Sequence, residues 1–196
     1  MNPGNFLILV ISDSHGNVPA LTTALEWAQQ YAPGSIGDKS AGSTPFFNAA
    51  IFLGDGADDL AAASARAGFT PSWYKVRGNG DFNFSTPHTL VMEIPGTISR
   101  KLFLAHGNRY GVDGGGLTIA AAARAAGAEA ALFGHTHVPH CSMLNEIFLL
   151  NPGSIGRSRS NAGPTFAVLD CPAKGPLSAR FFCLLNRGRK VQELEL

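Results

Sequence analysis

The stretch "ALFGHTHVPH", residues 131–140, runs from apolar residues through a glycine into two histidines that stand one residue apart. A short apolar run bounded by a glycine is typical of a strand buried inside a sheet. The histidines follow directly after the predicted strand, and imidazole is a common ligand of transition metals. The stretch therefore predicts a buried strand that leads into a functional site.

Five further apolar runs end in the same way, in a glycine or a polar residue. They are "FLILVISDSH" (6–15), "AAIFLGDG" (49–56), "WYKVRGNGD" (73–81), "LFLAHGN" (102–108) and "IFLLNPGS" (147–154). Alanine-rich stretches with helical spacing lie between several of them, at 19–31, 58–68 and 116–127. Pro19 suits a first helical turn, and Gly68 and Gly127 suit helix ends. Strands that alternate with helices predict an α/β fold with a largely parallel sheet.

The pattern changes after about residue 150, where helical spacing stops. "TFAVLD" (165–170) and "LSARFFCLLN" (177–186) indicate antiparallel strands, which could form a second sheet layered on the first. The ending "RGRKVQELEL" suits a solvated last strand or a tail. Residues 32–48, rich in Gly, Ser and Pro, are expected to form a surface loop insertion, either a tolerated one or a lid over the site or a partner. The length of 196 residues fits a single domain over 1–196.

Composition narrows the range of partners. Fifteen Lys and Arg against fourteen Asp and Glu give a net charge of +1, so no groove for nucleic acid is evident and no anionic membrane is implied. The apolar run 6–11 is too short to cross a membrane. Cys141, Cys171 and Cys183 form no C-x-x-C pair and are expected to be buried or half-buried in a reducing compartment. A cytoplasmic protein is therefore expected, and homo-oligomerisation stays open.

Polar side chains stand at the carboxyl ends of the predicted strands. They are Asp13, His15, Asp55, Asn79, His106, His135 and His137. In an open α/β sheet these ends gather along one edge. Each residue alone has an ordinary structural explanation, such as a turn or a cap. Gathered together, they would be costly to bury unless positive charge neutralised them, and few basic residues stand near these motifs. Bound cations are the simplest source of that charge.

These side chains are more ligands than a single cation of this kind coordinates. Two cations that share one carboxylate would coordinate all of them. The mixture of imidazole, carboxylate and amide suits Mn²⁺, Fe²⁺ or Zn²⁺ better than Ca²⁺. Two such ions roughly 3.5–4 Å apart are a known device for hydrolysing phosphoesters. One ion holds hydroxide for attack on phosphorus, while both neutralise charge on the phosphoryl oxygens.

The motifs in their order along the chain resemble those of the calcineurin-like metallophosphoesterase superfamily. They are D-x-H (Asp13, His15), G-D (Asp55), G-N-x-D (Asn79, Asp81), H-G (His106) and G-H-T-H (His135, His137). The opening "SDSHGN" (12–17) and "NPGS" (151–154) make the chain similar to the YfcE-type phosphodiesterases of that superfamily. The resemblance implies a four-layer αββα sandwich with mixed sheets and the site at the carboxyl ends of the strands.

The resemblance also implies how the ligands divide between two divalent ions per chain. One ion would be held by Asp13, His15, His137 and Asp55, and the other by Asp55, Asn79, His106 and His135. Asp55 would thus bridge the two. Mn²⁺ is the favoured metal, with Fe, Zn, Ni or Mg as alternatives. Asp81, Asn79 and His106 are the expected catalytic residues.

Two positions depart from the pattern of the family. Many relatives carry a histidine, and YfcE-like members often a cysteine, where this chain has Gly80, so a proton donor to the leaving group is missing. Close relatives commonly read H-G-H where this chain has Asn108. Asn108, Ser154 and Arg157 are the expected substrate contacts, although Arg157 and Arg159 could equally be surface charge.

The leading hypothesis is a dimetal phosphoesterase that hydrolyses small or activated phosphodiesters by attack of metal-bound hydroxide on phosphorus. One alternative is a phosphomonoesterase of the same fold. The other is a scaffold protein that keeps the fold and works through protein contacts, although every ligand position here holds a competent residue.

Overall fold

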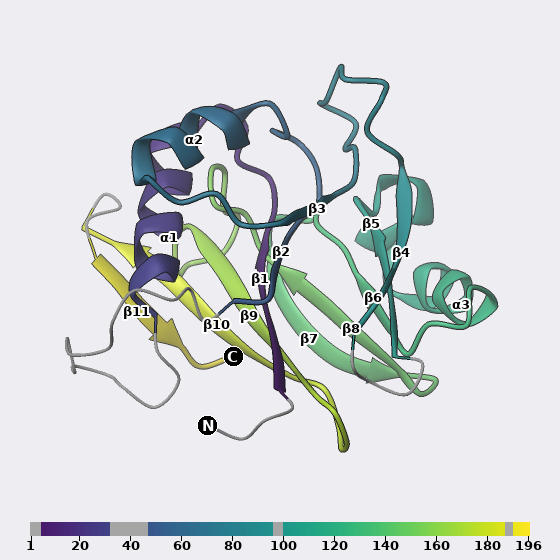
Figure 1. Ribbon diagram of the computed structural model, residues 1–196. Coiled ribbons are helices and arrows are strands. Elements are labelled where there is room, and N and C mark those ends of the chain that lie inside the picture. The colour runs from purple at the N-terminus through teal and green to yellow at the C-terminus, as the bar shows by residue number, and fades with distance from the viewer. Residues whose placement is uncertain (1–4, 32–46, 96–99, 187–189) are drawn as a thin grey trace.

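Two β-sheets form the centre of the described part of the chain, residues 5–31, 47–95, 100–186 and 190–196 of a computed structural model (Figure 1). One has the strand order β11-β10-β9-β1-β2-β3, and the other has the order β4-β5-β6-β8-β7. The first contains β1 (Asn5–Ile11), β2 (Ala49–Phe52), β3 (Trp73–Lys75), β9 (Thr165–Pro172), β10 (Ser178–Leu185) and β11 (Lys190–Leu194). The second contains β4 (Thr89–Glu93), β5 (Lys101–Ala105), β6 (Ala130–Leu132), β7 (Pro139–Leu144) and β8 (Ile147–Pro152).

Both sheets are mixed, with a parallel centre. Strands β1, β2 and β3 run parallel, as do β5, β6 and β8, while β9 and β4 pair antiparallel with β1 and β5. All six apolar runs of the sequence form strands of these parallel sets. The prediction of a second sheet from the C-terminal strands was wrong, because β9 bonds along the edge of β1 and so extends the first sheet.

Helices cover the outer face of each sheet (Figure 1). α1 (Val18–Gln30) and α2 (Asp59–Ala67) pack on the six-stranded sheet, and α3 (Leu117–Ala125) packs on the other. Two short 3₁₀ turns, η1 (Asn108–Tyr110) and η2 (Val112–Gly114), join β5 to α3. The side chain of Asn17 accepts a hydrogen bond from Ala20 N–H at the start of α1, and Gly68 ends α2 in the left-handed conformation.

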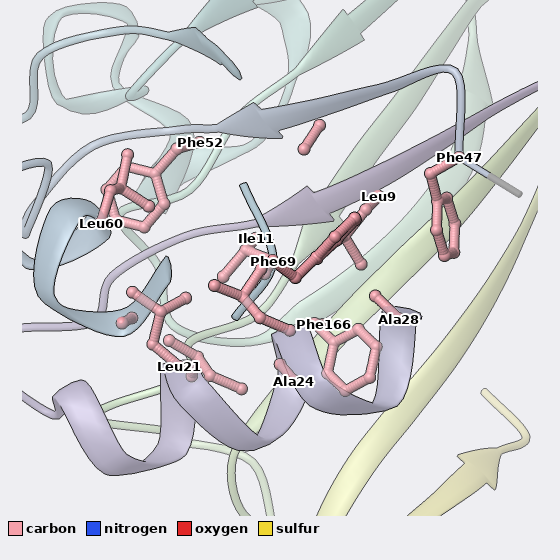
Figure 2. Packing of buried hydrophobic residues seen from close by; sticks show 14 of the residues in the cluster. Leu9, Ile11, Leu21, Ala24, Ala28, Phe47, Phe52, Leu60, Phe69 and Phe166 are labelled. Atoms are coloured by element: carbon pink, nitrogen blue, oxygen red, sulfur yellow. The ribbon is translucent and has the colours of Figure 1, made fainter. Parts of the chain in front are cut away.

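The alternation of side chains along β1 separates two hydrophobic cores. Leu9 and Ile11 face the helices, where they pack with residues such as Leu21 and Phe166 (Figure 2). Ile8 and Val10 point the other way, into the core between the two sheets. A third core lies between α3 and the five-stranded sheet. The order helix, sheet, sheet, helix confirms the expected four-layer αββα sandwich.

Two edge strands were missed, and one cysteine is placed differently from the expectation. Strands β4 and β7 were not anticipated, because each lies at a sheet edge and buries too few side chains to show a clear apolar run. Cys141 lies on β7 and is exposed, whereas Cys171 and Cys183 are buried as expected.

Residues 32–46 of the predicted loop 32–48 lie outside the described residues. Phe47, however, is buried in the core under the helices (Figure 2), and Asn48 accepts a hydrogen bond from Leu7 N–H. In the described ranges, no helix has the length and apolar character needed to cross a membrane.

Candidate metal centre

The loops that follow the parallel strands are bonded to one another at the carboxyl edge of the sheets. Asp13 N–H donates to the carbonyl of Gly54, and His15 N–H donates to that of Asp55, each at 3.0 Å. Gly134 N–H donates to the carbonyl of His106 at 2.9 Å. These bonds join the loop after β1 to that after β2, and the loop after β5 to that after β6. A bond from His135 N–H to Asp13 Oδ2 joins the two pairs, so side chains far apart in sequence meet in one cluster.

Five of the expected ligands have a positive φ angle, which non-glycine residues seldom adopt. They are Asp13 (φ 56°), His15 (45°), Asp55 (57°), His135 (67°) and His137 (61°). Each such conformation costs free energy that the surrounding structure must supply, and such residues concentrate at functional sites. An unfavourable backbone conformation at these positions therefore orients the side chains toward the cluster.

Glycines let the loops approach closely enough for this arrangement. A Cβ at Gly78 would lie 2.1 Å from Asp55 Oδ1, and one at Gly134 would lie 2.5 Å from Asp13 Oδ2. A side chain at either position would therefore displace a carboxylate of the cluster.

Each buried carboxylate has one oxygen held by the protein and one directed into the cluster. Asp13 Oδ2 accepts hydrogen bonds from Ser12 Oγ and from His135 N–H, and Asp55 Oδ1 accepts one from Gly80 N–H. Asp13 Oδ1 lies 3.1 Å from His137 Nε2. Asp55 Oδ2 lies 3.5 Å from His106 Nε2 and 3.8 Å from His15 Nε2, between the two imidazoles.

Two imidazoles are oriented by hydrogen bonds from their outer nitrogens. His106 Nδ1 donates to the carbonyl of Leu53 at 2.7 Å, and His137 Nδ1 donates to that of Arg157 at 2.6 Å. This leaves the Nε2 lone pair of each ring facing the carboxylates, as backbone partners orient metal-binding histidines. His15 Nε2 lies 3.1 Å from His137 Nε2, so both rings are aimed at one point.

Two ligand groups result, and they share Asp13. The first consists of Asp13, His15 and His137, and the second of Asp13, Asp55 and His106, with donor atoms within 4.8 Å of one another. Asp13 Oδ1 and His106 Nε2 are buried and have no hydrogen-bond partner among the described residues. Buried polar atoms of this kind need a partner, and these donors fit divalent cations.

The pKa values of the clustered side chains are shifted in the direction that favours a bound cation. Although burial raises the pKa of Asp13, the neighbouring imidazoles of His137 and His15 bring that pKa well below its usual range. Burial likewise raises the pKa of Asp55, but the neighbouring His106 imidazole makes the net shift downward. The neighbouring Asp13 carboxylate raises the pKa of His137. Both carboxylates are thus held as anions. They also favour protonation of the neighbouring histidines, and a bound cation would take the place of those protons.

Asn79 and His135 lie at the margin of this cluster. Asn79 is exposed, between Gly78 and Gly80, both of which lie against the Asp55 carboxylate. The His135 ring lies next to that of His106, with ring centroids 5.2 Å apart. Its Nε2 lies 3.1 Å from Asp113 Oδ2 on η2. Nδ1 is therefore the His135 nitrogen left to act as a ligand. Asp113 was not anticipated, because no motif marks it.

Asp81 has a structural setting that the sequence did not indicate. Its carboxylate accepts hydrogen bonds from four backbone N–H groups, those of Asp55, Gly56, Ala57 and Gly78. These bonds join the loop after β2 to the loop after β3 and so hold Asp55 in position. With its oxygens engaged in this way, Asp81 suits positioning of the bridging residue better than proton transfer.

The expected substrate contacts differ in their accessibility. Asn108 and Arg157 are exposed, but Ser154 is fully buried. The Ser154 hydroxyl donates to the carbonyl of Asp13 and accepts from Gly156 and Arg157 N–H, so this placement leaves it no path to a substrate. Asn151, which was missed, donates to the carbonyl of Gly134 and to Thr136 Oγ1 and so supports the G-H-T-H loop. Its place in "NPGS", at the end of a strand, was the available signal.

Comparisons with known proteins agree with this geometry. The calcineurin-like phosphoesterase superfamily domain matches residues 6–174. A probable metallophosphoesterase of Bacillus subtilis, YsnB, is 31% identical over 120 residues, which is 61% of this chain and 68% of YsnB.

Solved structures share the fold at lower identity. A conserved protein of Streptococcus pneumoniae described as a predicted phosphoesterase has a TM-score of 0.70 at 22% identity, with 97% of each chain covered. Vps29 of Entamoeba histolytica in complex with Zn²⁺ has a TM-score of 0.67 at 20% identity, covering 96% of this chain and 97% of Vps29. YfcE, a phosphoesterase of E. coli, has a TM-score of 0.59 at 18% identity, covering 96% and 98% of the two chains.

Proposed function

The chain belongs to the calcineurin-like phosphoesterase superfamily, and we propose that it is a dimetal phosphodiesterase that acts on small or activated phosphodiesters. The observation that carries the proposal is the pair of ligand groups joined at Asp13, with the Asp55 carboxylate between His15 and His106. Asn79 and His135 would complete the second group at its margin. Asp55 would be shared by the two ions, since its Oδ2 lies near both His15 and His106, and Mn²⁺ would be the favoured metal.

Bound cations would supply two things in this site. They would neutralise charge on the phosphoryl oxygens, and they would lower the pKa of a water enough for it to lose a proton and attack phosphorus at neutral pH. The side chains that would hold these ions are oriented by backbone hydrogen bonds. Asp13, Asp55, His106 and His137 each make one, so they would hold the ions in defined positions. The neutral amide of Asn79 adds an oxygen without adding charge, which favours approach of an anionic ester. Asp81 holds the loop of Asp55 in place through its four backbone bonds.

The test compares a diester with a monoester of the same leaving group. Protein loaded with Mn²⁺ is expected to hydrolyse bis(p-nitrophenyl) phosphate with a higher kcat/KM than p-nitrophenyl phosphate. His137→Ala should lose most of this activity, whereas His140→Ala is the matched control, because His140 is an exposed histidine on β7 bonded to Ser142. Preference for the monoester would instead indicate a phosphomonoesterase.

A scaffold function deserves a separate test, since proteins named Vps29 share the fold. Loaded protein that binds metal but hydrolyses neither ester would favour that alternative. The buried ligand atoms without partners, Asp13 Oδ1 and His106 Nε2, favour the enzyme, because contacts on the surface do not require them.

A further inference from the structure

Two arginines converge on one histidine beside the candidate metal centre. Arg77 follows β3, Arg109 lies in η1, and His88 directly precedes β4. One terminal nitrogen of each guanidinium (Nη2) is hydrogen-bonded to His88 Nε2, that of Arg109 at 2.7 Å. We call Arg77, Arg109 and His88 the arginine cluster.

The arginine cluster holds more hydrogen-bond donors than His88 can accept. An imidazole nitrogen has a single lone pair, yet two guanidinium groups are aimed at His88 Nε2, and each carries further N–H donors. Arg77 Nη1 is buried and has no hydrogen-bond partner among the described residues. Among the residues that the structure describes, the arginines paired with carboxylates are Arg100 and Arg124, and neither Arg77 nor Arg109 has such a pair.

The charges of the arginine cluster are likewise unbalanced. Burial and the neighbouring charges of Arg109 and Arg77 lower the pKa of His88, although a hydrogen bond to the Arg77 backbone opposes this shift, so the neutral ring accepts from the two guanidinium groups at Nε2. The Arg77 guanidinium is also held from its other side, where it lies over the exposed Phe84 ring at 4.7 Å from the centroid. Two cations are therefore held close together with no anion between them, and an anionic ligand would satisfy both.

The arginine cluster adjoins the second ligand group of the metal centre. Pairing of Thr89 with Ala105 places His88 and His106 at the same end of β4 and β5. Arg77 directly precedes Gly78, and a Cβ at Gly54 would contact both Gly78 N and His106 Nδ1, so this backbone lies against the His106 ring. Arg77 and Arg109 thus stand two and three residues from the expected ligands Asn79 and His106.

We propose that Arg77 and Arg109, held by His88, bind a second phosphate group of the substrate while the scissile phosphodiester occupies the metal centre. The preferred substrates are then small phosphodiesters that carry a further phosphate. A phosphate fits better than a carboxylate, because its oxygens point in three directions and can accept from both guanidinium groups at once. This inference rests on the proposed phosphodiesterase function.

The experiment uses two esters that differ only in the second phosphate. Thymidine 5′-(p-nitrophenyl phosphate) has one phosphate, and its 3′-phosphorylated form has the same nucleoside, scissile bond and leaving group. With Mn²⁺-loaded protein, the kcat/KM for the 3′-phosphorylated ester should exceed that for the other ester by about tenfold or more, since hydrogen bonds between charged groups commonly contribute this much. Arg109→Gln and Arg77→Ala should bring the ratio close to one.

Arg124→Gln is the matched control, because Arg124 is an exposed arginine on α3 paired with Glu146 and should keep the wild-type ratio. A wild-type ratio near one, or a high ratio that survives in both cluster variants, would overturn the inference while leaving phosphodiesterase activity intact. If the protein hydrolyses none of the three compounds, the two thymidine esters and bis(p-nitrophenyl) phosphate, the proposed function itself is refuted. Arg109 is exposed, so Arg109→Gln tests the inference even if Arg77→Ala does not fold.

Discussion

Asp55 lies between the two parts of the candidate metal centre, since its Oδ2 faces both His15 and His106. If Asp55 bridges two ions, Asp55→Ala should abolish hydrolysis and remove more than one ion per chain, because its charge offsets the repulsion between the cations. His15→Ala should mainly weaken one site. Elemental analysis after Mn²⁺ loading and desalting measures both. Equal retention of two ions in Asp55→Ala would assign the bridge to Asp13, which is the carboxylate that both ligand groups contain.

Asp113 accounts for the orientation of His135. Since His135 Nε2 lies 3.1 Å from Asp113 Oδ2, the carboxylate holds the ring with Nδ1 free for a metal. Asp113→Asn should lower the affinity of one ion by about 10–100-fold and leave the other nearly unchanged, as is usual for partners of metal-binding histidines. Competition with a metal chelator measures this. Glu146→Gln, another exposed acid, is the control. Loss of both ions, or of neither, would contradict the assignment.

Gly80 stands where the resemblance to the family leads us to expect a proton donor. General acid catalysis commonly contributes about 10²–10⁴-fold, so aryl diesters, whose leaving groups need no proton, should be cleaved much faster than alkyl diesters. Gly80→His should narrow this gap when kcat is compared on both classes at saturating Mn²⁺. Similar wild-type rates on the two classes would mean that another group supplies the proton.

The structure adds a necessary control for this substitution. A Cβ at position 80 would lie 3.2 Å from the Asp55 carboxylate, which also accepts the Gly80 N–H bond. Gly80→Ala therefore introduces the same crowding without an imidazole. Only a gain of Gly80→His over Gly80→Ala on alkyl diesters counts as proton donation.

At the scale of the secondary-structure elements, the loop after β8 packs onto the loop after β1. A Cβ at Gly156 would lie 1.9 Å from the carbonyl oxygen of Ser14, which is backbone and cannot move aside cheaply. Gly156→Ala should destabilise the fold by at least about 1–3 kcal/mol and reduce metal uptake, because the displaced backbone carries Asp13 and His15. Urea unfolding and metal analysis test both effects.

Gly114→Ala is the matched control for that substitution. A Cβ at Gly114 contacts nothing within 4 Å, and its φ is not positive. Gly114→Ala should therefore leave the free energy of unfolding and the metal content close to those of the wild type. A Gly156→Ala protein with wild-type stability and metal content would show that the two loops are not tightly coupled.

The edge strands explain why some elements escaped the sequence patterns. Strand β4 buries Met92 but exposes most of its other side chains, and β7 exposes Cys141 and Met143. Their pairing depends on long-range hydrogen bonds to β5 and β8. Central strands such as β1 bury both faces and so produce an unmistakable apolar run.

At the scale of the whole molecule, metal binding and folding should be coupled. The ligands come from loops that meet only in the folded chain, so ions bind the native state preferentially. At a free metal concentration about 100 times Kd, each ion adds about 2.7 kcal/mol to the free energy of unfolding. For a chain of 196 residues this corresponds to a Tm increase of about 2–4 °C per kcal/mol.

Thermal unfolding with and without a chelator measures this coupling, and elemental analysis should find close to two ions per loaded chain. The Tm increase should be smaller in Asp55→Ala. No more than a trace of metal after loading would contradict the dimetal centre as a whole.

Local patterns were sufficient for the six parallel strands and for the polar residues at their ends, whereas the four-layer arrangement was implied by the resemblance to a family. Continuous apolar runs, alanine-rich helices between them, and polar residues at strand ends are all properties of neighbouring residues. Because parallel strands align their carboxyl ends, such patterns also placed Asp13, His15, Asp55, His106 and His137 near one another, as the structure does.

Other features depend on contacts between distant segments, and no local pattern encodes them. The positive φ of five expected ligands arises because several loops constrain one another. The pairing of His135 with Asp113 and the four backbone bonds of Asp81 require neighbouring strands of one sheet to pair, and the bond of Ser154 to Asp13 requires the two sheets to meet. The arginine cluster joins three segments that meet only when β4 pairs with β5, because its members are separated by 11 and 21 residues along the chain.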